Sequence, residues 1–192
     1  ELDGTLTKRV IGSIVEMLYA PENPMRVIEK MARPDVKIIS LTITEGGYNY
    51  NEATGEFNFE NTAIQHDLEN PQAPKTVFGY LTQALKMRKE KGLQGITIQS
   101  CDNIQGNGHM IEKMLLSYVK VAEPTLVSWI KENVSFPNAM VDRITPATSP
   151  SDISSLKETS CIDDAWPVVC EPFKQWVIED NFIAGRPAWE TV

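Results

Sequence analysis

Residues 36–43, VKIISLTI, give the strongest strand signal in this 192-residue sequence and constrain its fold more than any other segment. A nearly continuous apolar run of this length is typical of a strand that is buried on both faces, as strands are in a parallel sheet. Parallel neighbours are joined by crossover connections, which are usually helices. The run therefore predicts an α/β fold in which helices cover a parallel sheet.

Strand-like and helix-like patterns alternate around this run. The expected strands, which share β-branched apolar side chains, are residues 10–18, 36–43 and 96–101. The expected helices, which place apolar side chains on one face, are residues 24–32, 75–91, 109–122 and 124–134. Pro24 fits the first turn of its helix, and Gly92 ends the following one. This order predicts right-handed βαβ units.

The remaining segments are less regular. Residues 44–74 form a long polar stretch, but its four aromatic side chains indicate an ordered, packed loop. Further on, we expect a short helix over residues 149–158 that begins at a serine cap. A strand is expected over residues 168–178, interrupted by Glu171 and Pro172.

Composition excludes several classes of function. Eighteen Lys and Arg residues face 26 Asp and Glu residues, and the net charge of −8 is the wrong sign for nucleic-acid binding. No apolar run approaches the roughly 18 residues that span a bilayer, so we expect no membrane partner. The first residues carry no secretory signal pattern. Three cysteines without CxxC spacing fit the reduced thiols of a cytoplasmic protein.

Two polar segments follow expected strands, where open parallel sheets bind their ligands. TITEGGY, residues 42–48, places Glu45 beside a glycine pair, and the alternative is a turn with a solvated carboxylate. SCDNIQGNG, residues 100–108, could offer amide donors to an oxyanion or phosphate at a helix N-terminus. The alternative, which the residues support equally, is a helix capped by Asn107 and a turn closed by Asp102.

Two later carboxylates also occupy unusual positions. Asp142 stands beside Arg143 in FPNAMVDRITP, either as a substrate clamp or as half of a structural ion pair. Glu171 precedes Pro172 within an apolar run, which indicates a hydrogen-bonded interior role.

Other kinds of functional site find less support in the sequence. Gly106-x-Gly108 lacks the third glycine of a dinucleotide fingerprint, and no HxxxH or CxxC spacing indicates a metal site. A Cys–His nucleophile is not supported by any spacing either.

Seven blocks of the sequence, in order along its length, resemble the polyol-specific long-chain dehydrogenase/reductases, the mannitol 2-dehydrogenase family to which fructuronate reductase and arabinitol dehydrogenase are related. They are SLTITEGGY (residues 40–48), TGEF (54–57), PKTVFGYLTQAL (74–85), SCDNIQGNG (100–108), FPNAMVDRITP (136–146), WPVVCEPFKQWVIED (166–180) and GRPAWE (185–190). Several blocks of nine or more residues are far more specific than a single short motif.

The resemblance implies a Rossmann-type NAD domain followed by a mostly helical substrate domain, with no metal. It implies hydride transfer between NAD and a polyol/ketose pair, D-mannitol and D-fructose above all, with a lysine as general base. By position, Asn103 would be the oxyanion-hole amide that holds the reacting oxygen beside the cofactor. Asp142 would contact substrate hydroxyls or the nicotinamide end of NAD, and Glu45 would line the same cleft.

Two family features have no counterpart in these residues: the Gly-rich phosphate loop and the KxxxxNxxH motif that carries the catalytic lysine. We therefore expect residues 1–192 to form the latter part of an NAD-binding Rossmann-type domain that ends at the junction to the helical domain. The fold would be incomplete, without its first βαβ unit. General-base catalysis contributes about 10²- to 10⁴-fold in rate, so we expect the chain alone to be inactive. The alternative is a non-catalytic truncated homologue that acts as a scaffold or assembly partner.

Overall fold

The computed structural model describes residues 6–51 and 53–191. They form two compact units. The larger unit comprises Ile14–Met140 with residues 178–191, and the smaller comprises residues 6–13 with Val141–Val177. Each unit is described by itself below.

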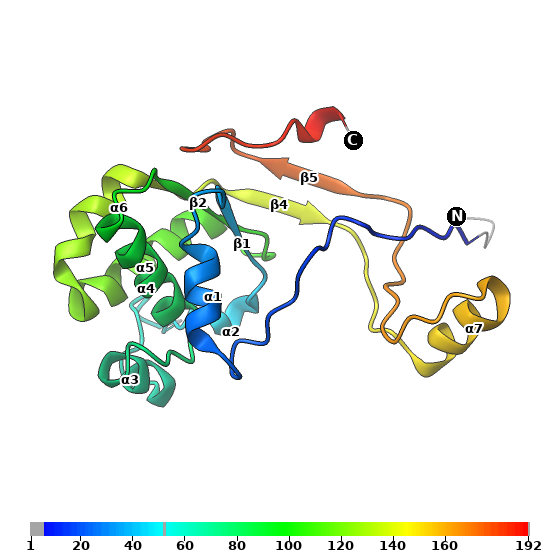
Figure 1. Ribbon diagram of the computed structural model, residues 1–192, viewed down its shortest axis with the longest axis horizontal. Coiled ribbons are helices and arrows are strands. Elements are labelled where there is room, and N and C mark those ends of the chain that lie inside the picture. Colours follow the sequence, from blue (N-terminus) through cyan, green and yellow to red (C-terminus); the bar gives the residue numbers. More distant parts are fainter. Residues whose placement is uncertain (1–5, 52, 192) are drawn as a thin grey trace. The chain divides into compact units, whose positions relative to one another are not determined.

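The larger unit is built on a parallel sheet of three strands (Figure 1). The strands are β1 (Ile38–Leu41), β2 (Ile96–Ser100) and β3 (Val134–Ser135), in that order across the sheet. Every residue of the central strand β2 is buried. The predicted parallel α/β fold is confirmed, and the sheet is the partial Rossmann-type sheet that the family resemblance implied.

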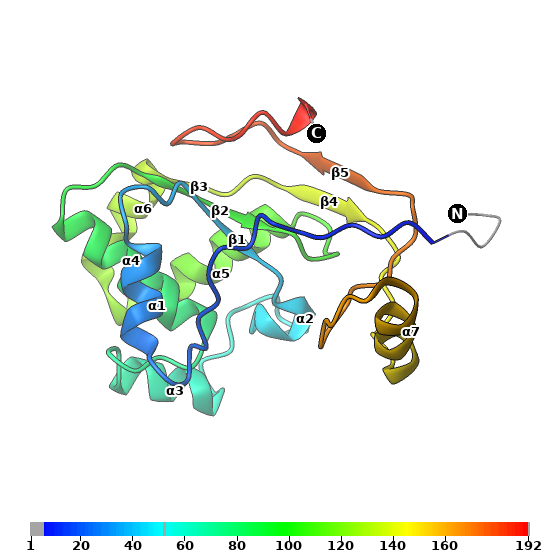
Figure 2. The same cartoon turned by 45° about the vertical axis from the view of Figure 1, so that its right-hand side comes forward.

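Helices connect these strands, and they pack as a layer against the sheet (Figure 2). The helices of the larger unit are α1 (Pro24–Met31), α2 (Thr44–Gly47), α3 (Thr62–Glu69), α4 (Val77–Glu90), α5 (Asn107–Ala122), α6 (Val127–Asn133) and the short 3₁₀ turns η1 (Pro124–Leu126) and η2 (Trp189–Thr191). Side chains define the ends: Asn23 caps α1 by accepting from Arg26 N at 3.1 Å, and Thr76 caps α4. The predicted helices are confirmed to within a few residues.

The core lies between the sheet and the layer of helices. Its largest apolar side chains with no solvent exposure are Ile28, Tyr48, Ile64, Phe78, Leu81, Leu85, Ile96, Ile98, Ile111 and Met114. Phe78 packs edge-on against Phe57 at 4.9 Å between ring centroids, and Tyr118 lies 6.1 Å from the same ring. These contacts bury α4 and α5 on their apolar faces, as the helical spacing predicted.

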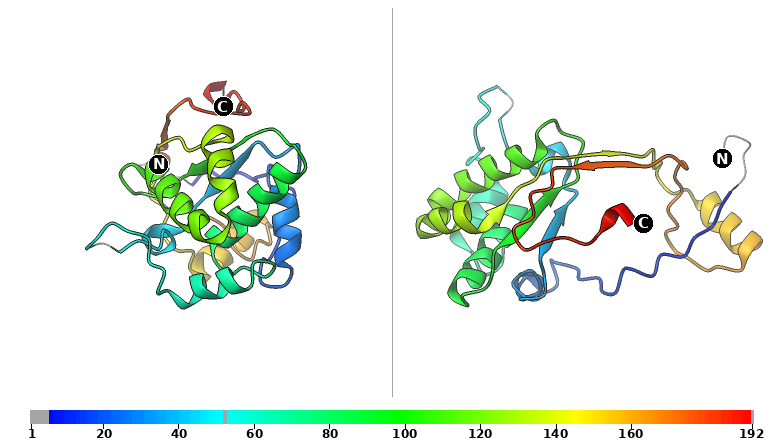
Figure 3. Two further views of the ribbon diagram at one scale, coloured as in Figure 1. Left: turned by 90° about the vertical axis from the view of Figure 1, so that its left-hand side faces the viewer. Right: turned by 90° about the horizontal axis from the view of Figure 1, so that it is seen from above.

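The described residues of the long polar stretch between β1 and α4 are packed, as its aromatic residues predicted, but the prediction of a loop throughout is wrong, because the stretch contains α2 and α3. Tyr50 and Phe57 form an isolated bridge, and this hairpin projects from the unit in both views of Figure 3. Tyr48 and Phe57 are buried and belong to the core cluster. Aromatic burial therefore anchors a segment whose polar composition alone would suggest a mobile loop.

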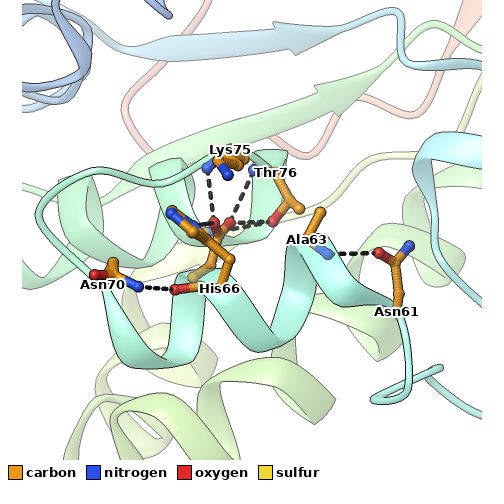
Figure 4. A network of polar contacts seen from close by, with 8 residues as sticks. Asn61, Ala63, His66, Asn70, Lys75 and Thr76 are labelled. Carbon is orange, nitrogen blue, oxygen red and sulfur yellow. Dashed lines mark hydrogen bonds and ion pairs between the residues drawn. The ribbon is translucent and has the colours of Figure 1, made fainter.

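A buried carboxylate fastens α3 to the start of α4. Asp67 has no solvent exposure, and it accepts hydrogen bonds from Lys75 N at 2.7 Å, Thr76 N at 2.8 Å and Thr76 Oγ1 at 2.6 Å. Figure 4 draws these bonds from Lys75 and Thr76. A Cβ on Gly79 would lie 2.5 Å from Asp67 Oδ2, so the glycine is required by this close approach.

The prediction of a strand over residues 10–18 is wrong. These residues contain no strand, and Val10, Ile14, Val15 and Met17 are exposed. A strand exists only through hydrogen bonds to a neighbouring strand, and no segment of the described chain pairs with this one. The β-branched residues favour an extended strand, but a strand does not form here because no described strand pairs with the segment.

The smaller unit contains α7 (Pro150–Ser160) and the greater part of β5 (Gln175–Ile178), which pairs with β4 (Ala139–Asp142) in a two-stranded sheet. Ser149 and Asp152 form a capping box at the start of α7, which confirms the predicted serine cap. The strand predicted over residues 168–178 is confirmed only at its end, because the segment through Glu171 and Pro172 is irregular.

Candidate active site at the strand tips

The carboxyl ends of β1 and β2 lie next to each other. Leu41 is opposite Ser100 in the parallel register, and Cys101 N continues the ladder by donating to Leu41 O at 2.8 Å. The segments that carry Glu45 and Asn103 therefore leave the sheet at the same edge. Both side chains are exposed, and neither is hydrogen-bonded to another residue that the structure describes. Two of the predicted site residues are thus on neighbouring segments with their polar groups available.

Asp102 joins the two strand tips. Its side chain is 9% exposed, and its Oδ1 and Oδ2 accept hydrogen bonds from Thr44 N at 2.8 Å and Ile43 N at 3.1 Å. Ile43, the residue at the N-cap of α2, makes no side-chain hydrogen bond to the first backbone amides of that helix. Asp102 therefore supplies the acceptors that the turn after β1 needs, from the tip of the neighbouring strand.

Tyr48 completes this hydrogen-bonded cluster from the other end of the turn. Its hydroxyl donates to Asp102 Oδ2 at 2.9 Å and is also hydrogen-bonded to the hydroxyl of Ser100. The phenol is buried, and burial, with the nearby Asp102 carboxylate as a lesser cause, raises the pKa of Tyr48. The phenol is protonated at neutral pH, and its raised pKa keeps it a hydrogen-bond donor to a higher pH than an exposed tyrosine.

Thr44 has an unusual backbone conformation. Its φ of 59° lies in the left-handed region, which β-branched residues rarely adopt. Such a conformation costs on the order of 1–3 kcal/mol and persists only where surrounding contacts enforce it. The hydrogen bond from Thr44 N to Asp102 is such a contact.

Asn107 ties the start of α5 to the segment after β3. Its side chain has no solvent exposure; Oδ1 accepts from Ala139 N at 2.9 Å, and Nδ2 donates to Asp102 O at 2.9 Å and to Ala139 O at 2.8 Å. Asn107 is itself the first residue of α5, so the interpretation of Asn107 as the helix cap is wrong. Its partners come from distant segments, which sequence spacing does not reveal.

The first amides of α5 are occupied by the protein itself. Asn138 Oδ1 accepts from Gly108 N at 3.0 Å and from His109 N at 3.3 Å. A Cβ on Gly108 would lie 2.4 Å from Phe136 O, so close chain packing accounts for this glycine. The structure therefore favours a structural role for the GNG segment over the phosphate cradle considered above.

Asp142 and Glu171 belong to the smaller unit. Asp142 lies exposed in β4 and forms no ion pair with Arg143, whose Nε donates to Glu171 O at 3.0 Å. Glu171 Oε1 accepts from Ile144 N at 2.6 Å, which confirms that it is hydrogen-bonded, but the side chain is only partly buried, so the predicted interior position is wrong. Among the described residues, the ion-pair alternative for Asp142 is thus wrong, and its carboxylate remains available.

The described part of the chain offers no metal site, Cys–His pair or membrane-spanning helix. No group of three or more His, Cys, Asp or Glu side chains is placed there to hold a metal ion. Cys101, Cys161 and Cys170 are free thiols. His66 contacts Asp67 at 3.2 Å and His109 contacts Asn138, and within the described ranges no hydrogen bond joins either histidine to a cysteine. No described helix has the length and apolar character to cross a membrane.

Sequence reasoning missed the supporting residues Tyr48, Asp102 and Asn138 as parts of one site. The available signal was the position of Asp102 directly after a buried strand and directly before Asn103. Nothing in the spacing indicated that its carboxylate would bind the turn 58 residues earlier.

Comparison with known proteins covers nearly the whole chain. The family model described as the mannitol dehydrogenase Rossmann domain matches residues 3–191. Mannitol 2-dehydrogenase of Pyricularia oryzae is 52% identical over 188 residues, which are 97% of this chain and 38% of that protein. The polyol:NADP oxidoreductase of Gluconobacter oxydans is 48% identical, and the match covers 97% of this chain and 39% of that protein.

Solved structures agree with these relatives. The mannitol 2-dehydrogenase of Pseudomonas fluorescens, in a ternary complex with NAD and D-mannitol, superimposes with a TM-score of 0.92 at 52% identity. That match covers 95% of this chain and 37% of the other. A substrate-free D-sorbitol dehydrogenase gives a TM-score of 0.85 at 48% identity, over 89% of this chain and 35% of the other. The chain therefore spans less than two-fifths of the length of these relatives.

Proposed function

The chain belongs to the mannitol dehydrogenase family through its Rossmann domain, and from this membership we propose that it forms part of an NAD-dependent polyol oxidoreductase. The reaction is hydride transfer between NAD(H) and a polyol/ketose pair, D-mannitol and D-fructose. The observation that carries this proposal is the pair of neighbouring strand tips with exposed, unpartnered Glu45 and Asn103. The names of the relatives support the substrate class.

In this proposal Asn103 is the catalytic residue of the chain. Its side-chain amide donates a hydrogen bond to the reacting oxygen, where negative charge develops as the carbonyl is reduced. A donor in such a position contributes about 10²- to 10³-fold to kcat. Glu45 lines the substrate cleft, and Asn103 adjoins the cofactor. For Asp142, which belongs to the smaller unit, we propose contact with substrate hydroxyls or with the nicotinamide end of NAD from the family resemblance alone.

The hydrogen-bond donors at the strand tips suit the nicotinamide end of NAD better than its pyrophosphate. The exposed amide of Asn103 at the sheet edge suits the nicotinamide end, where NAD when bound accepts or supplies the hydride. The amides of Gly108 and His109 are already bound by Asn138, so α5 is not the holder of the pyrophosphate. We therefore assign no pyrophosphate contact to α5.

The domain assignment follows from the same premise. We propose that residues 1–192 are the latter part of an NAD-binding Rossmann-type domain that precedes a helical substrate domain. The general-base lysine that the family resemblance implies is not among these residues, so the polypeptide by itself is inactive. The location is proposed to be cytoplasmic. Exposed apolar residues such as Ile14, Val15 and Met17 favour the alternative of a non-catalytic assembly partner.

A hybrid enzyme tests the proposal directly. Residues 6–191 replace the matching stretch of the Pseudomonas fluorescens enzyme, and NADH oxidation is measured with D-fructose, with NADPH as the comparison cofactor. We expect turnover with NADH, and a fall of about 10²- to 10³-fold in kcat for Asn103→Ala. A folded hybrid that oxidises neither cofactor would favour the assembly partner.

The size of the native polypeptide gives a second, independent test. An antibody raised against residues 6–191 is used to immunoblot the source cell. A product more than twice 21.5 kDa supports a complete enzyme that contains this chain. A product near 21.5 kDa would contradict the enzymatic proposal.

A further inference from the structure

We propose that Asp102 is a positioning residue for this reaction, because its carboxylate fixes the turn at residues 43–48 against the segment that carries Asn103. The inference rests on the proposed function and deepens it. It assigns a role to a buried acid whose own atoms do not touch the substrate.

The contacts of Asp102 are directed at one backbone turn. Both carboxylate oxygens accept from consecutive amides, those of Ile43 and Thr44, and Oδ2 also accepts from the Tyr48 hydroxyl. Asp102 forms no ion pair with any residue that the structure describes. Its negative charge is thus met by backbone and hydroxyl donors alone, and such charge-assisted bonds are the stronger class.

The placement of these contacts links the two site residues. Asp102 immediately precedes Asn103, and Thr44 immediately precedes Glu45. The hydrogen bond of 2.8 Å between Thr44 N and Asp102 Oδ1 therefore connects the backbone on which Asn103 stands with the backbone on which Glu45 stands. A shift of this bond changes the separation of the two polar groups.

The turn would relax if the carboxylate were lost. Thr44 is held at a φ of 59°, and Asn49 at the other end of the same segment has a φ of 53°. A left-handed threonine needs an enforcing contact. Without the acceptor, we expect Thr44 to return to an ordinary conformation and to carry Glu45 away from its place.

A role confined to fold stability would behave differently. Asp102 is a buried polar residue at the strand tip, whereas the core that supports the sheet consists of apolar residues such as Ile39, Ile98 and Met114. A purely stabilising residue alters the fraction of folded enzyme, which lowers the apparent kcat without changing local backbone order in the folded fraction. A positioning residue lowers kcat in folded enzyme while cofactor affinity persists.

The test compares Asp102→Asn with the matched control Glu132→Gln in the hybrid enzyme described above. Asparagine has nearly the same shape but replaces one acceptor oxygen by an NH₂ donor. Glu132 is an exposed carboxylate on α6, away from the strand tips. For Asp102→Asn we expect kcat to fall about 10- to 100-fold, since small misplacements of reacting groups have effects of that size. The Kd for NADH should change less than about threefold.

Local order provides the second readout. Amide hydrogen exchange should accelerate at residues 43–48 in Asp102→Asn and remain unchanged in the control. If Asp102→Asn does not fold, Asp102→Glu keeps the charge but displaces the oxygens by one methylene, and the same pattern is expected. An unchanged kcat, or a loss of kcat with unaltered exchange at residues 43–48, overturns the inference.

The two proposals fail in different ways. If the unmodified hybrid is folded but inactive, the proposed function is wrong. If the unmodified hybrid turns over and Asp102→Asn matches Glu132→Gln, only the positioning role is wrong.

Discussion

The strand tips of the larger unit bury polar side chains, whereas the surface of the smaller unit exposes apolar ones. At the strand tips, buried polar groups such as Asp102 and Asn107 have hydrogen-bond partners within the unit. In the smaller unit, large apolar side chains such as Trp166, Val168 and Phe173 are more than half exposed. The polar cluster around Asp102 and Asn107 finds its hydrogen-bond partners inside the larger unit, whereas Trp166, Val168 and Phe173 of the smaller unit display apolar surface of the kind that marks interaction sites.

This difference in burial shows which contacts fix the structure of the larger unit. Burial of the polar cluster makes the geometry of the strand tips a consequence of packing, because an unsatisfied buried group is costly. The exposed apolar residues of the smaller unit contribute little to its internal stability. Substitutions of buried, closely packed residues in the larger unit should therefore reduce stability strongly, and substitutions of exposed residues should have small effects.

The largest expected difference in the free energy of unfolding is between Phe78→Ala and Phe173→Ala. Phe78 has no solvent exposure and packs on two aromatic rings, so its truncation should reduce the free energy of unfolding by about 3–5 kcal/mol. Phe173 is 52% exposed, and its truncation should change the free energy by less than about 0.5 kcal/mol. Urea denaturation followed by circular dichroism measures both, and equal losses would refute the contrast.

Gly108→Ala against Gly46→Ala tests the close approach at the start of α5. The new Cβ at residue 108 meets backbone atoms that cannot move aside, so a loss of about 1–3 kcal/mol is expected. Gly46 has nothing within 4 Å of its Cβ position, and its variant should be near neutral. The same denaturation experiment applies; a neutral Gly108→Ala would mean that the segment through Phe136 yields easily.

Asp67→Asn probes the buried carboxylate that joins α3 to α4. One of its acceptor oxygens becomes a donor and faces the donors of Lys75 or Thr76, so we expect a loss of about 1–3 kcal/mol. Glu69→Gln, which alters an exposed carboxylate on the same helix, is the matched control. Thermal unfolding should separate the two variants, and identical melting temperatures would contradict the anchoring role.

Glu179→Gln should have the smallest effect and the one that depends on pH. Hydrogen bonds from the backbone and side chain of Asn138 lower the pKa of Glu179 below its usual 4.5. Because the folded-state pKa is depressed, the carboxylate stabilises the fold above the unfolded pKa, and this contribution is lost as the pH falls through the folded pKa. The variant should therefore differ from the parent at pH 7 in denaturation curves and approach it as the pH falls through the lowered folded-state pKa of Glu179.

Much of the larger unit could be predicted from local patterns. The run at residues 36–43, the periodic helix at residues 75–91 and the aromatic residues of the polar stretch each indicate the structure that forms. The segment at residues 10–18 shows the limit of such patterns, because its strand tendency finds no partner among the described residues. Propensity is local, whereas pairing depends on another part of the chain.

The sequence by itself determined the α/β class, the order of β1, α4, β2, α5 and α6 along the chain, and the strand-tip positions of Glu45 and Asn103, since these follow from periodicity and chain direction. Only the tertiary structure decided that Asp102 binds the turn after β1 and that Asn138 rather than Asn107 caps α5. Hydrogen bonds between segments 30 or 58 residues apart depend on how the elements pack in three dimensions, and no local pattern encodes that packing.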